Sequence, residues 1–181
     1  IQRAPSGWVI EDSVWKPRRL SSYTQGSITL FSYFYGACRD PNGCPVSWST
    51  FESVHQEIEK DPKLHGRVRL VYMSLDPDVD TPEMLSFYRS KSSEASPWYF
   101  LTTWSMRFLK PILKGGGITI SYELDDKGQR TGQIGHFLKV FLIDKQGWVR
   151  EVYALGFLDP EVIMNDIRTL LMEQDAQKGQ S

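Results

Sequence analysis

Ile28-Thr-Leu-Phe-Ser-Tyr-Phe34 runs directly into Tyr35-Gly-Ala-Cys-Arg-Asp-Pro-Asn-Gly-Cys-Pro45, the segment that holds both cysteines of the chain. The first segment is rich in β-branched and aromatic residues, which predicts a buried strand. Apolar residues then recur at helical spacing over 46–58, which predicts an amphipathic helix. The two thiols therefore lie in a loop before a helix start, where unpaired N–H groups stabilise a thiolate.

Strand and helix patterns continue to alternate after this unit. Strands are predicted over 68–75 and 98–102, and helices from Pro82 onward and over 105–113. Gly115-Gly-Gly117 lacks the lysine of a phosphate loop and predicts a helix stop. From Ile118 apolar and polar residues alternate, and residues 137–143 and 148–153 predict a hairpin before a last helix that opens at Asp159-Pro160. This order predicts an α/β fold, a mixed sheet with helices on both faces.

The length of 181 residues suits one domain, and 40% apolar residues predict a globular core. We expect an irregular N-terminal arm over 1–27, the domain over 28–173 and a frayed polar tail over 174–181. A net charge of −1 without a basic cluster argues against nucleic acid and against an anionic membrane surface. The chain begins at Ile1 without a methionine, so we expect a processed or trimmed product, with room for a signal peptide or membrane anchor upstream.

The cysteine loop by itself is compatible with three kinds of chemistry. The pair can bind a metal, exchange disulfides with a partner, or form a structural bridge that closes the loop. Thioredoxin-type enzymes usually separate their cysteines by two residues, whereas five stand between Cys38 and Cys44. A peroxidase is a weaker option, because Tyr35-Gly-Ala precedes Cys38 in place of the expected proline and threonine.

Other chemistry-bearing residues have simpler interpretations. Asp76, Asp78 and Asp80 alternate as in part of a calcium loop, but the glycine and glutamate of that loop are not at the required spacing. Helix capping by Asp80 or Thr81 is the favoured interpretation, with at most an indirect role at a metal site. The methionines are predicted to be core residues rather than thioether ligands; they are Met73, Met84, Met106, Met164 and Met172.

Four segments, in matching order between about Ile28 and Tyr153, resemble the Sco/SenC family of copper-delivery proteins. They are Tyr33–Cys38 with Cys44-Pro45, Ser74–Glu83, Phe100–Thr102, and Gly135-His136-Phe137 with Phe141–Asp144 and Gly147. The resemblance implies a thioredoxin-like fold with a C-terminal β-hairpin and helix. The chain looks like a divergent member. The family usually has three residues between its cysteines, Gly-Lys where Gln25-Gly26-Ser27 stands, and Val-Asp before the histidine.

The resemblance also implies a function and a site. It implies a copper ion held by Cys38, Cys44 and His136, and thiolate suits Cu(I) while imidazole suits both Cu(I) and Cu(II). Among the histidines only His136 lies at the start of a strand predicted in the second half, whereas His55 lies on the helix after the cysteines and His65 in a polar loop. We therefore expect a metallochaperone rather than an enzyme, delivering copper to a partner such as a cytochrome oxidase subunit. It would be exported, periplasmic or membrane-anchored, or in the mitochondrial intermembrane space.

Two rival hypotheses remain open at this point. One is a thiol–disulfide oxidoreductase that acts on a partner's cysteines and so prepares them for copper. The other is a binding module that has lost both metal and redox function. The spacing of Cys38 and Cys44 and the altered segment before His136 keep both hypotheses alive.

Overall fold

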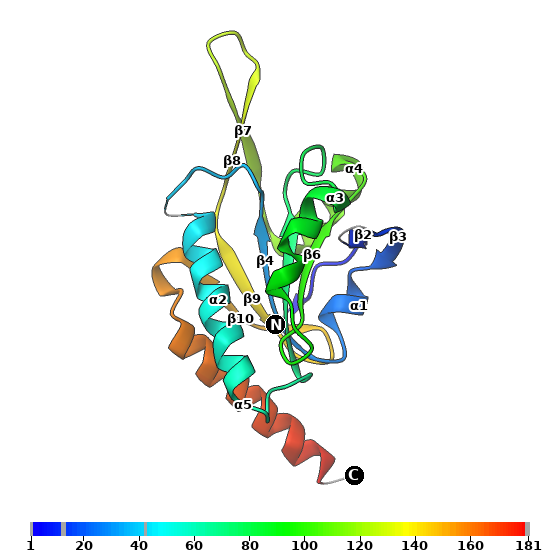
Figure 1. The fold of residues 1–181 in the computed structure, drawn as a ribbon, viewed down its shortest axis with the longest axis vertical. Coiled ribbons are helices and arrows are strands. Elements are labelled where there is room, and N and C mark those ends of the chain that lie inside the picture. The colour runs from blue at the N-terminus through cyan, green and yellow to red at the C-terminus, as the bar shows by residue number, and fades with distance from the viewer. Residues whose placement is uncertain (1, 12–13, 42, 180–181) are drawn as a thin grey trace.

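The computed structural model of the chain describes residues 2–11, 14–41 and 43–179, and its centre is an eight-stranded sheet (Figure 1). The sheet order is β1-β10-β9-β4-β5-β6-β2-β3. Strands β4, β5 and β6 run parallel and all other neighbours antiparallel, so the predicted mixed sheet is confirmed. The strands are β1 Gln2–Arg3, β2 Trp8–Glu11, β3 Val14–Arg19, β4 Ile28–Phe34, β5 Val68–Ser74, β6 Trp98–Thr102, β9 Lys139–Ile143 and β10 Trp148–Ala154.

Helices cover both faces of this sheet. The helices are α1 Ser21–Thr24, α2 Cys44–Lys60, α3 Pro82–Leu85 with the 3-10 helix η1 Ser86–Lys91, α4 Met106–Gly116, the 3-10 helix η2 Leu155–Phe157, and α5 Pro160–Lys178. Helices α2 and α5 pack on one face and against each other, while α1 and α4 lie on the other face (Figure 1). No helix among the described residues is long and apolar enough to cross a membrane.

The central strand β4 contributes to the core on both faces, and all seven of its residues are buried. Successive side chains of a strand point to opposite faces. Leu30 and Phe34 accordingly pack beneath α2 and α5, whereas Phe31 and Tyr33 pack beneath α4. A strand fixed on both faces gives the cysteine loop that follows it a rigid starting point.

The N-terminal segment is more regular than the sequence predicts. Strands β2 and β3 extend the main sheet beyond β6, and β1 pairs with β10 at the opposite edge, so the segment crosses the molecule. Val9 and Ile10 are fully buried, and Pro17 is tolerated because it lies on the edge strand β3. The prediction of an irregular arm over 1–27 is therefore wrong in its local structure. At the other end α5 continues to Lys178, well into the predicted tail.

A second, two-stranded sheet projects from the body of the molecule (Figure 1). It consists of β7 Ile120–Leu124 and β8 Arg130–His136. The alternation after Ile118 correctly indicates β7, whereas β8 was not predicted. The helix before this hairpin also ends later than expected: α4 includes Gly115 and Gly116, and Gly117, which has φ +59°, is its C-cap. Gly116 suits this helix because a Cβ there would lie 2.3 Å from the hydroxyl of Tyr33.

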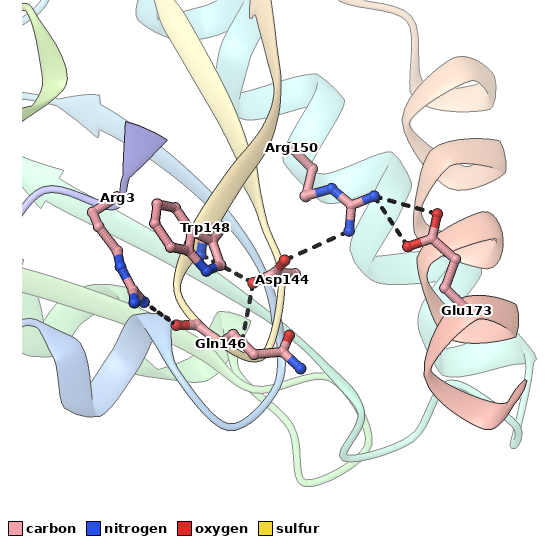
Figure 2. Close-up of polar contacts among 6 residues, drawn as sticks. All are labelled: Arg3, Asp144, Gln146, Trp148, Arg150 and Glu173. Atoms are coloured by element: carbon pink, nitrogen blue, oxygen red, sulfur yellow. Dashed lines mark hydrogen bonds and ion pairs between the residues drawn. The ribbon is translucent and has the colours of Figure 1, made fainter. Parts of the chain in front are cut away.

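A polar network ties both chain ends to the β9–β10 turn (Figure 2). The carboxylate of Asp144 accepts the backbone N–H of Trp148 at 2.9 Å and lies 3.5 Å from Arg150 Nη1. The other terminal nitrogen of Arg150 contacts Glu173 on α5 at 3.0 Å, and the guanidinium of Arg3 stacks 3.8 Å above the ring of Trp148. This network anchors β1 and α5 at the end of the sheet formed by the β9–β10 turn.

Candidate metal centre

The parallel pairing of β4 with β5 brings two loops to the same edge of the sheet. Phe34 and Ser74 are register partners, so both strands end together. The cysteine loop follows Phe34, and the segment with the three aspartates follows Ser74. Loops at the carboxyl ends of parallel strands are where sites form in open α/β sheets. This edge is therefore where the structure concentrates the predicted chemistry.

Asp80 binds the cysteine loop instead of capping a helix. Its carboxylate accepts the N–H of Gly36 at 3.1 and 3.2 Å and the hydroxyl of Ser74 at 2.6 Å. Burial raises the pKa of Asp80, and the two hydrogen-bond donors oppose that shift. The cap of α3 is Thr81, whose hydroxyl accepts the N–H of Met84. Capping by Asp80 is thus corrected: the residue fixes the entrance of the loop.

Helix α2 begins at Cys44, two residues earlier than predicted, with Gly43 as its N-cap and Pro45 in its first turn. Cys38 lies in the preceding loop, and both cysteines are partly buried free thiols. The two side chains are in hydrogen-bonding contact with each other, and Cys38 also contacts the hydroxyl of Tyr35. The structure thus brings the two predicted sulfur ligands together despite the five residues between them.

The two thiols differ in acidity. Burial alone would raise the pKa of Cys38, but hydrogen bonds from the Cys44 thiol, the Tyr35 hydroxyl and backbone N–H groups hold that pKa below its ordinary value. Burial, the hydrogen bond to Cys38 and the charge on Cys38 raise the pKa of Cys44 to about 12. Cys38 is therefore the more acidic thiol of the pair, and Cys44 is the one that keeps its proton to higher pH.

This difference predicts the order in which the thiols react with iodoacetamide in the metal-free, reduced protein. Only the thiolate reacts, so near neutral pH Cys38 should be alkylated more than about tenfold faster than Cys44, since one pKa unit changes the thiolate fraction tenfold. The difference between the two alkylation rates should narrow as pH rises toward the pKa of Cys44. Peptide mass mapping over a time course measures both rates, and equal rates near neutral pH would contradict the assignment.

His136 lies at the end of β8, rather than at the start of a strand over 137–143 as predicted. Its Nδ1 lies 3.3 Å from the carbonyl oxygen of Phe137. A carbonyl only accepts, so Nδ1 carries the proton and Nε2 keeps a lone pair. Burial lowers the pKa of this imidazole, which favours the neutral form that binds metals.

Cys38 and His136 line the same cavity, whose volume is about 850 Å³. Tyr35 lines it as well, and its ring meets the imidazole edge-on with 6.1 Å between centroids. Cys44 instead borders a smaller cavity of about 200 Å³ that Cys38 and Tyr35 also line. Over the described part of the chain, no three histidine, cysteine, aspartate or glutamate side chains are gathered closely enough to hold a metal ion. The structure thus brings the two sulfurs into contact and places the imidazole in the larger cavity, which Cys38 also lines.

Two residues that the sequence did not single out connect the cysteine loop with β8. The carboxamide of Gln133 contacts the backbone of Ala37 and Arg39, and the hydroxyl of Tyr35 accepts the N–H of Ile134 at 3.2 Å. These contacts join residues more than ninety positions apart. No local pattern signals them; only the departure from the family before His136 marked this segment as unusual.

The remaining histidines and methionines lie elsewhere. The ring of His55 packs on Trp98, and His65 contacts the carbonyl of Glu59. Met73 and Met164 are buried, as predicted. The prediction that all five methionines are core residues is wrong for Met84 and Met172, which are 49% and 65% exposed.

A thioredoxin-like sheet with a cysteine pair at a helix start and a histidine on a projecting hairpin defines the class of protein. A family model described as SCO1/SenC matches residues 18–172, and the chain therefore belongs to the SCO1/SenC family. The predicted thioredoxin-like fold and the family resemblance are both confirmed. No curated protein sequence matches the chain.

Solved structures of the family share the fold at low sequence identity. The chain is similar to copper-bound ScoI of Arabidopsis thaliana, with 16% identity, a TM-score of 0.75, and coverage of 94% of this chain and 98% of that one. The chain is also similar to a SCO1/SenC family lipoprotein of Bacillus anthracis, with 23% identity, a TM-score of 0.73, and coverage of 94% of this chain and 95% of that one. A third similar structure is BsSco, which is described as a member of the Sco family of cytochrome c oxidase assembly proteins with a disulfide switch. Its identity is 18% and its TM-score 0.67, and the match covers 93% of each chain.

Proposed function

We propose that this chain binds copper and delivers it to a copper site in a partner, with Cys38, Cys44 and His136 as the ligands. The observation that carries the proposal is the contact between two free thiols, one of which shares a cavity with a neutral histidine. Thiolates suit Cu(I), and imidazole suits both oxidation states. The donor set therefore fits copper as a cargo that is bound, held and released.

Binding through all three residues requires movement, because the described residues do not gather three ligands in one place. The imidazole is carried by a hairpin that forms its own small sheet, the Cys38 sulfur by a loop and the Cys44 sulfur by the first residue of α2. Rotation of the His136 side chain, together with a shift at the Cys44 end of the cysteine segment, would bring Nε2 toward the sulfurs. The same mobility would let a partner's ligands replace these residues during transfer.

The family supports a proposal for the partner and for the compartment. Copper-bound relatives and the description of BsSco support a role in the assembly of cytochrome oxidase, so we propose one of its copper-binding subunits as the receiver. The Bacillus anthracis relative is a lipoprotein, which supports an exported protein that works outside the cytoplasm, anchored or periplasmic.

The test is copper transfer in solution. The reduced chain is loaded with Cu(I), freed of excess metal, and mixed with the metal-free copper domain of a cytochrome oxidase subunit. We expect one copper per chain by elemental analysis and transfer to the receiver at chain concentrations where free copper is negligible. A chain that retains no copper, yet reduces a disulfide in the receiver, would instead identify a thiol–disulfide oxidoreductase.

A further inference from the structure

We propose that Gln133 is a positioning residue that fixes Cys38 relative to the strand carrying His136, and so sets the affinity of the copper site. This inference rests on the proposed function, because it concerns the same site. It assigns a role to a side chain that is neither a ligand nor part of the cysteine loop.

The carboxamide of Gln133 holds the backbone on both sides of Cys38. Its Nε2 donates to the carbonyl oxygen of Ala37 at 2.9 Å, and its Oε1 accepts the N–H of Arg39 at 3.1 Å. The Gln133 side-chain amide thus pairs with the carbonyl before Cys38 and with the N–H after it. A neighbouring β-strand would make the same pair of hydrogen bonds through its backbone. The contact constrains the backbone at Cys38 and leaves its sulfur available.

A second contact makes the connection rigid. Ile134, the next residue of β8, donates its N–H to the hydroxyl of Tyr35 at 3.2 Å, and that hydroxyl also contacts Cys38. The ring of Tyr35 also meets the imidazole of His136 edge-on. Ile134 is itself buried in the core beneath α4, which anchors this end of the hairpin. The loop and β8 therefore move as a unit as long as the Gln133 contacts persist.

Only a glutamine satisfies this geometry among side chains of its size. Glutamate keeps an acceptor for the Arg39 N–H but has no donor for the Ala37 carbonyl when ionised. Methionine keeps the length of the side chain and provides neither. Asparagine is one methylene shorter. Gln133→Glu and Gln133→Met therefore remove one and both contacts with little change in volume.

Loss of the contacts should weaken metal binding through the cost of ordering the loop. A loop that is already held loses less conformational freedom when the metal assembles its ligands. We expect Gln133→Met to weaken Cu(II) binding about tenfold, since two neutral hydrogen bonds are lost. Gln133→Glu should release the Ala37 carbonyl, because an ionised carboxylate cannot donate to it.

The experiment compares the full-length wild type, Gln133→Met, Gln133→Glu and Asp125→Ala. Asp125→Ala is the matched control, because it removes two hydrogen bonds to the backbone N–H groups of Lys127 and Gln129 at the tip of the same hairpin. Two readouts are needed: amide hydrogen exchange of Arg39 in the metal-free protein, and Cu(II) affinity with nitrogen hyperfine structure in the electron paramagnetic resonance spectrum.

We expect Gln133→Met to speed exchange at Arg39 about tenfold, to weaken Cu(II) binding about tenfold and to broaden or remove the nitrogen hyperfine lines, while Asp125→Ala changes none of these. Unchanged copper binding in Gln133→Met, with or without faster exchange, would make the contact merely structural and overturn the proposal. A wild-type chain that binds no copper would overturn the proposed function and this role together.

Discussion

Replacing both Cys38 and Cys44 by serine is expected to weaken Cu(I) binding by more than about 100-fold. Loss of a group that only supports a metal ligand already costs 10–100-fold, and the double variant removes the sulfur ligands themselves. Serine oxygen is a hard donor that suits Cu(I) poorly. Competition with a chromophoric Cu(I) chelator measures the affinity.

The control for this variant is Ser49→Ala on an exposed part of the same helix, where the hydroxyl donates to the carbonyl of Val46. It should bind Cu(I) like the wild type. Single variants refine the result: if Cys38 is the dominant ligand, Cys38→Ser should cost at least as much as Cys44→Ser. Wild-type affinity in the double variant would show that copper binds elsewhere.

Replacing Phe51 by alanine is expected to lower the free energy of unfolding by about 3–5 kcal/mol, the usual cost of removing a buried phenylalanine. Phe51 is fully buried on α2 and stacks on Tyr72 of β5 with 4.4 Å between ring centroids. The loss is a large share of a total stability of about 5–15 kcal/mol. It should also loosen the helix that begins with Cys44. Urea denaturation followed by circular dichroism measures the loss in the free energy of unfolding.

Phe87→Ala provides the matched control for this prediction. The chemical change is the same, but Phe87 lies on η1 and is 76% exposed, so the expected loss is within about 0.5 kcal/mol. Similar losses in the two variants would contradict the assignment of Phe51 to the core between α2 and the sheet.

Much of the fold follows from the sequence because the relevant patterns are local. Residues 28–34 and 98–102 are strands as predicted, and the helical spacing after the cysteines correctly identifies α2. The order of these units, together with the resemblance, correctly predicts the thioredoxin-like fold. Short runs with strong periodicity carry this information without knowledge of distant contacts.

The sequence-based predictions fail where a strand has little alternation of apolar and polar residues. Strand β8 reads Arg-Thr-Gly-Gln-Ile-Gly-His, with two glycines and one aliphatic residue, so its sequence does not indicate a strand. Phe137 suggested a strand start but is 83% exposed between β8 and β9. His136 was consequently placed on the wrong element. Strand β2 was missed because its partner β6 lies some ninety residues away, and β3 follows β2 as the edge strand of the sheet.

The candidate site could be predicted only in part. The two thiols are separated by only five residues, and their proximity follows from that short separation. The roles of Tyr35, Asp80 and Gln133 depend on contacts between loops that follow different strands, and no local pattern contains such contacts. The assignment of Cys38, Cys44 and His136 as copper ligands remains a prediction for experiment.

X-ray absorption at the copper edge tests the ligand assignment most directly. In the wild-type chain loaded with one equivalent of copper, we expect two sulfur scatterers and at least one imidazole. The sulfur contribution should disappear in Cys38→Ser/Cys44→Ser, and the imidazole contribution should disappear in His136→Ala. A copper environment without sulfur, or one that the three substitutions leave unchanged, would contradict the proposed copper centre.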